Sequence, residues 1–314
     1  MQAGGYEIKL TEKAGRNAGT GTVQSGTGNV RENEEREILR VLEYRKEEGV
    51  CVPYFSFPLL EETGIVRHCF STRLGGVSGG VCESMNLSFT RGDDPQAVRE
   101  NFRRIGLVLG TESANFVCSD QTHTVNVRRV TRKDAGKGVL RERDYHDVDG
   151  LITNEPGLVL STFYADCVPL YFVDPVHRAI GLSHSGWRGT VSRMGAVTLA
   201  CMQQEFGTNP KDVVCAIGPS ICQDCYEVSE DVAEEFQKEF AGQEQEILLE
   251  KGNGKYQLDL WRANELVLLS AGVRQEHIAV TNVCTCCNPR VLFSHRASHG
   301  KRGNLGAFLS LEEV

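Results

Sequence analysis

The sequence contains no long apolar run. In its 314 residues no stretch approaches the ~18–20 apolar residues that span a bilayer, and the first residues lack the apolar core of a secretory signal. We therefore expect a cytoplasmic protein with no membrane partner. The twelve cysteines are accordingly expected to be reduced thiols rather than a disulfide framework.

Positive charge is also scarce. The chain carries 34 Lys and Arg against 42 Asp and Glu, a net charge of −8, and no basic stripe with interleaved aromatic residues. This balance argues against nucleic acid as a partner. A hydrophobic fraction of 40% and a charged fraction of 24% are ordinary for a globular protein.

Several catalytic signatures are missing. The sequence has no H-E-x-x-H, no G-x-S-x-G, no Walker loop, and no H-x-E paired with P-C-x-x-C. The last absence excludes the usual zinc deaminases, which carry that signature. Any zinc or nucleophile chemistry must therefore rest on another arrangement of residues.

Composition divides the chain near residue 50. Residues 11–30 are rich in Gly, Thr, Ser and Asn and lack periodicity, which predicts a flexible segment. Residues 31–48 suit a short amphipathic helix, although like charges could keep it solvated. We expect residues 1–50 to form a flexible extension with that short helix, and residues 51–314 to form a single catalytic domain.

Beyond residue 50, strand and helix patterns mix without strict alternation. Asp94 and Pro95 supply a cap and a first-turn proline for a helix through about Leu109, and a second helix is expected over Leu258–Ala271. Hairpin patterns are also evident. The prediction is an α+β fold of mixed or antiparallel sheets layered with helices.

The segment Ser161–Thr190 organises the rest of the chain. Its two apolar, β-rich runs, Leu170–Val173 and Ala179–Leu182, flank a turn, which predicts a β-hairpin. With Pro175-Val176 as a two-residue loop, Asp174 would pair with His177.

That register would place Cys167 directly across from His184. Opposed side chains have Cβ atoms about 4.5–5.5 Å apart, so a thiolate and an imidazole could share one metal ion or one proton. The register is decisive, since a shift of one residue would point the two side chains to opposite faces.

A glycine-rich segment follows the hairpin. Gly186 and Gly189 allow a close approach of the backbone to a ligand, and Thr190 is the expected N-cap of a helix. Free N–H groups at a helix start, together with the charge of Arg188, favour an anion. In the earlier turn Ser71–Gly80, Arg73 with Asn86 could bind an anion or a hydroxyl group, although a surface loop is the more ordinary interpretation there.

Three interpretations of the Cys and His residues stay open. In the first, His123, which follows a strand at Asn115–Cys118, joins Cys167 and His184 to bind zinc, with copper(II) as the alternative. Three protein ligands leave a fourth position for water, as in catalytic zinc sites. In the second, metal-free interpretation, Cys167 is a nucleophile and His184 its base, with Asp166 adjacent.

The third interpretation is a structural zinc knot. It would combine Cys222-x-x-Cys225 with Cys284 and either Cys286 or Cys287. The first half has the usual spacing, but C-x-C-C is not a standard second half.

An ordered set of motifs resembles a known family. The motifs are Ser71-Thr72-Arg73-Leu74-Gly75-Gly76-Val77-Ser78, Gln121-Thr122-His123, Ala165-Asp166-Cys167-Val168-Pro169, His184-Ser185-Gly186-Trp187-Arg188-Gly189, Ile217-Gly218-Pro219 with Tyr226-Glu227-Val228, and Phe293-Ser294-His295-Arg296. Together they resemble the YfiH family, also called the polyphenol oxidase or laccase-domain family, over about residues 52–314. Thr124 and Ser185 depart from the family's usual Gly and Ala.

The resemblance implies a single-domain α+β fold and a metal, zinc or alternatively copper, bound by His123, Cys167 and His184. It implies phosphorolysis of adenosine, inosine or methylthioadenosine, with adenosine deamination in the same pocket, and an older assignment as a copper-dependent phenol oxidase. Nucleoside and phosphate would be the small-molecule partners. The eight histidines form no H-x-H pair, which argues against a several-copper oxidase.

These implications give a set of expected site residues. The expected catalytic residues are Cys167, His184 and Arg73, and the expected substrate- and phosphate-binding residues are Arg73, Asn86, Arg188 and Tyr226. The acid or base is open among Glu227, Asp166 and His68.

Overall fold

The computed structural model describes residues 2–3, 5–10 and 37–313. The predicted flexible segment at 11–30 and the first part of the predicted helix at 31–48 lie outside this range. Among the described residues, no helix combines the length and the apolarity needed to cross a membrane.

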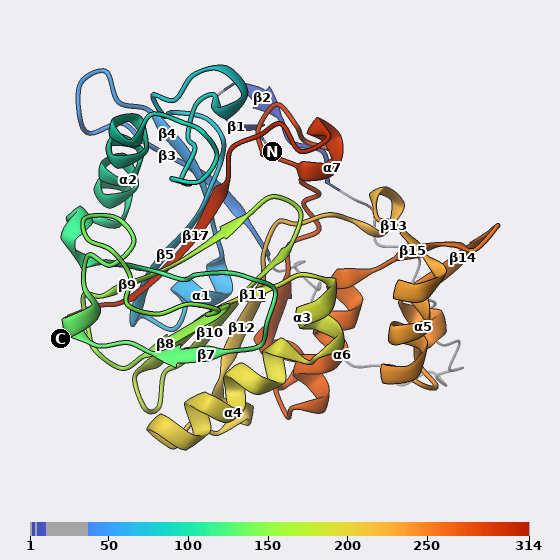
Figure 1. Cartoon of the computed structure of the whole chain (residues 1–314). Helices are drawn as coiled ribbons and strands as arrows, with labels where there is room; N and C mark the ends of the chain where they lie inside the picture. The colour runs from blue at the N-terminus through green and yellow to red at the C-terminus, as the bar shows by residue number, and fades with distance from the viewer. Residues whose placement is uncertain (1, 4, 11–36, 314) are drawn as a thin grey trace, which may run out of the picture.

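Two six-stranded sheets face each other at the centre of the molecule (Figure 1). In spatial order, the first sheet comprises β3 (Arg40–Tyr44), β4 (Val52–Ser56), β5 (Val66–Ser71), β17 (Leu305–Leu311), β9 (Val159–Tyr164) and β6 (Phe116–Cys118). The second comprises β16 (Ile278–Val280), β12 (Val214–Ile217), β10 (Val168–Asp174), β11 (Ala179–Ser185), β8 (Gly150–Thr153) and β7 (Val127–Arg129). Most neighbours pair antiparallel and three pairs are parallel, which confirms the mixed α+β prediction.

Helices cover the outer faces of the two sheets. Helix α2 (Pro95–Leu109) packs on the first sheet, and α4 (Met194–Phe206) and α6 (Leu260–Ser270) pack on the second. The shorter elements are α1 (Pro58–Glu61), α3 (Trp187–Val191), α7 (His295–Ser298), β1 (Gln2–Ala3) and β2 (Tyr6–Glu7). The result is a four-layer arrangement, helix–sheet–sheet–helix.

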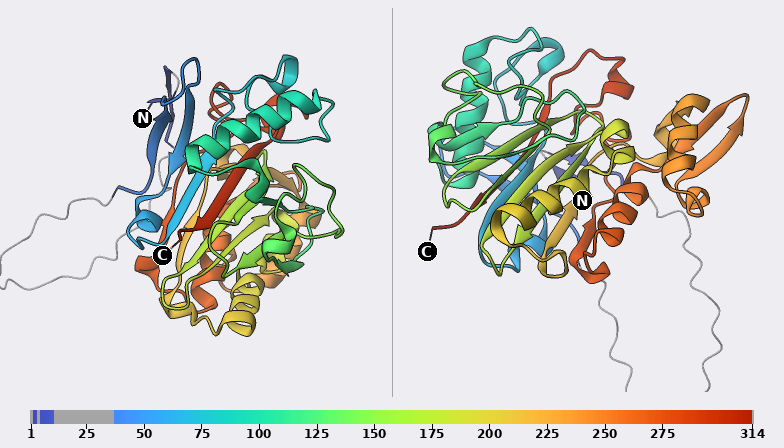
Figure 2. Two further views of the ribbon diagram at one scale, coloured as in Figure 1. Left: turned by 90° about the vertical axis from the view of Figure 1, so that its left-hand side faces the viewer. Right: turned by 60° about the horizontal axis from the view of Figure 1, so that its bottom comes forward.

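A small lobe projects from this body (Figure 2). It contains the sheet β13 (Glu227–Ser229), β15 (Lys255–Leu258) and β14 (Leu248–Gly252), together with α5 (Glu230–Glu239). The lobe begins directly after the Cys222–Cys225 segment, so the residues at its base are close in sequence to predicted site residues.

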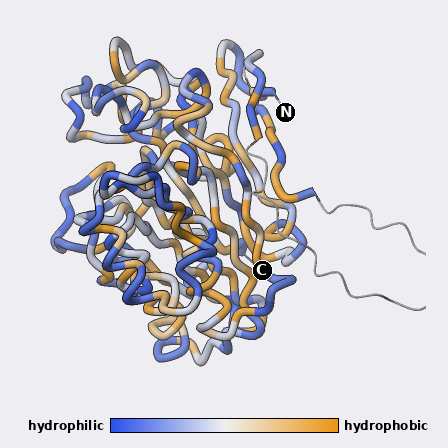
Figure 3. The backbone as a smooth tube through the Cα atoms, turned by 90° about the vertical axis from the view of Figure 1, so that its right-hand side faces the viewer, coloured by the Kyte–Doolittle hydropathy of each residue, from blue (hydrophilic) through white to orange (hydrophobic). Residues whose placement is uncertain are grey.

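The central strands β10 and β11 are buried on both faces. Tyr171 and Ile180 pack between the two sheets, whereas Leu170 and Phe172 pack under the helices. A strand covered on both faces needs apolar residues at every position, which explains the continuous apolar runs in the sequence. Figure 3 shows hydrophobic segments running through the interior of the body and hydrophilic segments over many of its outer loops.

The hairpin register differs from the predicted one. Asp174 pairs with Ala179, and Pro169 pairs with His184, so the loop has four residues rather than two. The Asp174 carboxylate accepts the N–H groups of Val176 and His177 and thereby stabilises the wider turn. The pairing is shifted by two positions, an even number, so the side chains stay on the predicted faces.

Two local predictions are wrong. Residues 40–44 form β3, which pairs with β4, and not a helix; Leu39 just before it is 1% exposed. Thr190 is not an N-cap, because α3 begins at Trp187 and the Thr190 hydroxyl donates to the Gly186 carbonyl inside that helix. By contrast, α2 begins and ends as predicted, with the Asp94 side chain accepting from the Gln96 N–H.

Candidate metal centre and cleft

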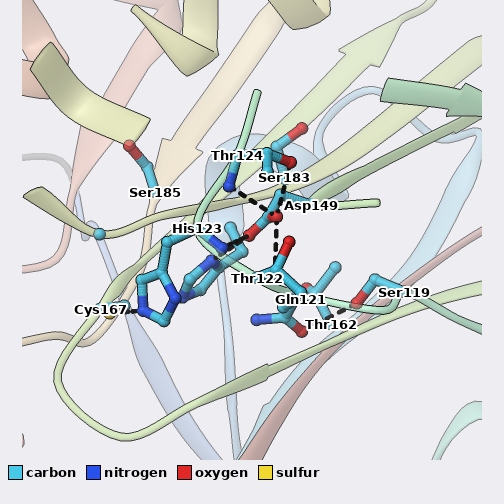
Figure 4. A network of polar contacts seen from close by, with 12 residues as sticks. Ser119, Gln121, Thr122, His123, Thr124, Asp149, Thr162, Cys167, Ser183 and Ser185 are labelled. Atoms are coloured by element: carbon cyan, nitrogen blue, oxygen red, sulfur yellow. Dashed lines mark hydrogen bonds and ion pairs between the residues drawn. The ribbon is translucent and has the colours of Figure 1, made fainter. Parts of the chain in front are cut away.

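Three distant segments bring His123, Cys167 and His184 together. Figure 4 shows two of these side chains, His123 and Cys167, side by side. His123 lies in the loop after β6, Cys167 directly precedes β10, and His184 lies near the end of β11. One nitrogen or sulfur of each lies within 4.8 Å of the others. The Cys167 Sγ is 3.9 Å from His123 Nε2, and the two imidazole rings are nearly perpendicular, with centroids 4.9 Å apart.

The hairpin explains the approach of Cys167 to His184. In the observed register the two side chains are diagonal rather than opposed, but they share the face between the sheets. Diagonal neighbours are still within reach of each other, because the imidazole extends toward the thiol. The predicted juxtaposition therefore survives an incorrect register.

Asp149, a residue that the sequence analysis did not single out, accepts hydrogen bonds from several residues of the site. It is fully buried, and its Oδ1 accepts from His184 Nδ1 at 2.7 Å and from the His123 N–H at 3.1 Å. Its Oδ2 accepts the N–H groups of Thr122 and Thr124 and the Thr124 hydroxyl. A carboxylate only accepts, so His184 carries a proton on Nδ1, and Nε2 is the ring nitrogen left to bind a metal.

The loop around His123 wraps the Asp149 carboxylate. His123 adopts φ 68°, in the left-handed region that costs a non-glycine residue about 1–2 kcal/mol. Three consecutive N–H groups, from Thr122 to Thr124, converge on the carboxylate and offset that cost. Asp149 burial alone would raise the pKa of its carboxyl, but the hydrogen bond and charge of His184 and these N–H groups lower it.

Cys167 and His184 shift each other's protonation. Burial raises the pKa of the Cys167 thiol, but the His184 charge and the His123 hydrogen bond lower it to about 6. Burial lowers the pKa of His184, but the Cys167 charge and the Asp149 hydrogen bond raise it to about 9. The protein alone therefore favours a thiolate, which is the form of cysteine that binds a metal or attacks as a nucleophile.

The three side chains line a cleft of about 680 Å³, a volume suited to a drug-sized or nucleoside-sized molecule. Five arginines also line it: Arg91, Arg99, Arg141, Arg143 and Arg302. Arg143 is paired with Asp120 at 2.7 Å, and Arg141 donates to backbone carbonyls. These two guanidinium groups are therefore already committed to the protein.

Arg302 is only partly committed to such contacts: its Nη1 donates to the Gly303 carbonyl and to the Asn304 side-chain oxygen. Among the described residues, its buried Nε has no hydrogen-bond partner. Burial and the neighbouring charge of Arg91 lower the pKa of Arg302 to about 10, while the charges of Asp166 and Cys167 act in the opposite direction. Arg302 and Arg91 are both positively charged, and the Arg302 Nε is a hydrogen-bond donor without a partner. This part of the cleft is therefore favourable to an anion. The sequence analysis missed both arginines, which lie in no motif of catalytic type.

Two residues expected to bind substrate, Arg73 and Asn86, make contacts within the protein. The Arg73 guanidinium donates to the carbonyls of Glu83 and Pro289 and lies 4.5 Å over the Phe293 ring. Asn86 is fully buried and donates to Asp93. Neither is among the residues that line the cleft, and their catalytic and binding roles stay predictions.

Arg188 and Tyr226 lie near the cluster but outside the residues that line the cleft. Arg188 is exposed and its guanidinium lies 4.3 Å over the Trp187 ring. Tyr226 is half-buried, with Arg296 over its ring at 5.5 Å. Burial and the Cys167 charge raise the pKa of Tyr226, which places its phenol within electrostatic range of the cluster.

The candidate acids and bases are occupied by structural contacts. His68 is buried, accepts the Phe57 N–H at 2.8 Å, and has its pKa lowered to about 3 by burial. Asp166 accepts from Thr285 and from the Arg296 N–H. Glu227 pairs with Lys251 at 2.8 Å.

Gly186 is required by a close approach. A Cβ at this position would meet His123 Cδ2 at 3.0 Å and Cys167 Sγ at 3.1 Å. We expect Gly186→Ala to displace both side chains, at an overpacking cost of about 1–3 kcal/mol, and to weaken the binding of added zinc roughly 10- to 100-fold in a chelator competition. Gly189→Ala is the matched control, because its Cβ would meet nothing closer than 3.5 Å; equal affinities of the two variants would contradict this account.

The donor set fits zinc. Two imidazoles and a thiolate are usual zinc ligands, and His184 has the carboxylate partner typical of metal-binding histidines. Among the described residues, the other cluster of metal-type side chains consists of four cysteines. These residues thus offer no multi-imidazole set for several copper ions.

Comparisons with known proteins identify the family to which the chain belongs. The family model described as multi-copper polyphenol oxidoreductase laccase matches residues 67–312. Purine nucleoside phosphorylase YlmD of Bacillus subtilis (strain 168) is 36% identical over 249 residues, covering 78% of this chain and 88% of that protein. Adenosine deaminase RL5, from an unknown prokaryotic organism, is 33% identical over 229 residues, covering 72% and 87%.

The fold is shared as well. The crystal structure of the hypothetical protein YfiH of Bacillus licheniformis matches with a TM-score of 0.79 at 33% identity, over 82% of this chain and 96% of that one. The sequence motifs, the family model and the solved structure therefore agree. The chain belongs to the YfiH family, also called the polyphenol oxidase or laccase-domain family.

Proposed function

We propose that the chain is a zinc-dependent purine nucleoside phosphorylase that also deaminates adenosine. The observation that carries the proposal is the His123, Cys167 and His184 set, which opens onto a nucleoside-sized cleft beside Arg302. Relatives named as a phosphorylase and as an adenosine deaminase support both reactions. A single zinc ion fits this donor set better than several copper ions do.

The arginines of the cleft would bind phosphate. In phosphorolysis a phosphate oxygen forms a bond to the ribose C1′ carbon and the bond from C1′ to the purine breaks. The electron pair of the broken bond goes to the purine, which takes up the proton that the phosphate loses. Arg302 and Arg91 would hold the phosphate and offset its charge next to the sugar. The free Nε of Arg302 supplies a donor that the protein itself does not use.

The ligand residues have separate tasks. A zinc ion, when bound, would supply Lewis-acid chemistry at its open position. Asp149 orients His184 and fixes the loop that carries His123, while the Cys167 thiolate completes the donor set. In deamination, water replaces the amino group of adenosine and ammonia leaves. This reaction would use the same three metal-binding residues in the same cleft.

Replacing Arg302 separates the two reactions. Because deamination needs no phosphate, we expect Arg302→Ala to lower adenosine phosphorolysis about 10²-fold, mainly through the KM for phosphate, and to change deamination little. Adenine with ribose 1-phosphate reports the first reaction, and inosine with ammonia reports the second.

Arg141→Ala is the matched control for charge. Arg141 also lines the cleft, but its guanidinium donates to the carbonyls of Lys133 and Ala135. We expect this variant to keep both activities. Absence of adenine from the zinc-loaded wild type would reject the phosphorylase proposal, and equal losses of both reactions in Arg302→Ala would reject the phosphate role.

A further inference from the structure

Four cysteines meet at the base of the projecting lobe. The sulfur atoms of Cys222, Cys225, Cys284 and Cys287 all lie within 4.8 Å of one another. The Cys287 Sγ is 4.0 Å from that of Cys222 and 3.5 Å from that of Cys225. The neighbouring Cys286 is not part of the cluster.

The spacing of the four residues is that of a metal site. The structure selects Cys284 and Cys287, so the second half reads C-x-x-C, like the first half at Cys222 and Cys225. The sequence analysis could not make this choice because Cys286 interrupts the pattern. Two C-x-x-C halves are a usual source of four thiolates for one zinc ion.

The distances fit a single ion. Four sulfurs each about 2.3 Å from one ion lie about 3.8 Å apart at the corners of a tetrahedron, close to the separations observed here. The N–H groups of Cys222 and Cys287 point at the Cys284 Sγ, at 3.3 and 3.4 Å, and such donors stabilise a thiolate. An iron–sulfur cluster would hold its thiolates at outer corners, further apart than this.

We propose that these four cysteines bind one structural zinc ion, separate from the His123, Cys167 and His184 site. The ion would join the segment that leads into the lobe to the segment that follows β16. Arg296 donates to the carbonyls of Cys225 and Glu227 and lies over the Tyr226 ring. The zinc site would thus fix the position of Tyr226 relative to the cleft. This proposal does not depend on the proposed function.

Zinc stoichiometry of the purified full-length chain tests the proposal. We expect Cys284→Ser/Cys287→Ser to bind one zinc ion fewer than the wild type and to unfold at a lower Tm. Cys286→Ser is the matched control, since it removes a cysteine of the same turn that lies outside the cluster, and it should keep the wild-type stoichiometry. A double variant that keeps the wild-type zinc content would overturn the proposal.

A second measurement does not depend on the folding of that variant. The His123→Ala/Cys167→Ala variant keeps all four cysteines, and its remaining zinc should show only sulfur neighbours, at about 2.3 Å, by X-ray absorption. No bound zinc, nitrogen neighbours, iron in place of zinc, or a disulfide among the four cysteines would each overturn the proposal. Loss of phosphorolysis in either experiment concerns the proposed function and leaves this result unaffected.

Discussion

Cys167→Ala is expected to lose the zinc ion of the cleft and to lower kcat/KM for adenosine phosphorolysis on the order of 10³-fold. The thiolate is the one anionic donor of the set, and its pKa of about 6 keeps it charged at neutral pH. Without it, two imidazoles remain, one of them on an exposed loop. Zinc content and steady-state kinetics of the same preparation measure the two effects together.

Cys201→Ala is the control, because Cys201 lies on α4, away from both cysteine-containing clusters. We expect it to match the wild type in zinc content and rate. Wild-type kinetics in Cys167→Ala would remove Cys167 from the mechanism.

The Cys167→His variant tests whether Cys167 acts as a metal ligand or as a nucleophile. The lowered pKa of Cys167 beside His184 is also what a cysteine nucleophile requires. Three histidines are an established zinc-binding set, so this variant should regain zinc and part of the activity lost in Cys167→Ala. Two results together would favour the metal-free nucleophile. The Cys167→His variant would bind zinc but be as inactive as Cys167→Ala, and the wild type would keep its activity after a chelator removes the metal.

Asp149→Asn is expected to lower the free energy of unfolding by more than the loss of a single hydrogen bond would. Both carboxylate oxygens accept from donors only, two at Oδ1 and three at Oδ2. An amide must turn its NH2 group toward one of these sets, whichever way it is oriented. We expect a loss of about 3–5 kcal/mol in the free energy of unfolding, as for a broken buried ion pair, and zinc binding weakened about 10- to 100-fold.

Asp147→Asn is the matched control for Asp149→Asn. Asp147 lies two residues away, is exposed, and adopts φ 55°, a conformation that asparagine tolerates well. Urea denaturation and zinc competition should leave this control unchanged. If Asp149→Asn behaved in the same way, Asp149 would not be the residue that organises the site.

Local patterns predicted the elements better than their pairing. Helix α2 carries its own start signal in Asp94-Pro95, and β10 and β11 carry continuous apolar runs, so each could be identified from neighbouring residues. The hairpin loop could not, since its length depends on side-chain contacts of Asp174. Residues 40–44 show no strict alternation of charged and apolar residues, and pairing with β4 makes them a strand.

The site was partly predictable for the same reason. His123, Cys167 and His184 stood out as metal-type residues in motifs, and an even shift of register left two of them on one face. Asp149 carried no signal, because its role follows from β8 lying beside β11. Arg302 likewise reaches the cleft only through the fold, from near the end of the chain.

Anomalous diffraction at the zinc edge, on crystals of the zinc-loaded chain, tests the central claim most directly. We predict an anomalous peak for a zinc ion between His123 Nε2, Cys167 Sγ and His184 Nε2. Its distance should be about 2.0–2.1 Å from each nitrogen and about 2.3 Å from the sulfur. A zinc-loaded, active crystal form with no peak between these three atoms, or with Cys167 turned away from the ion, would contradict it.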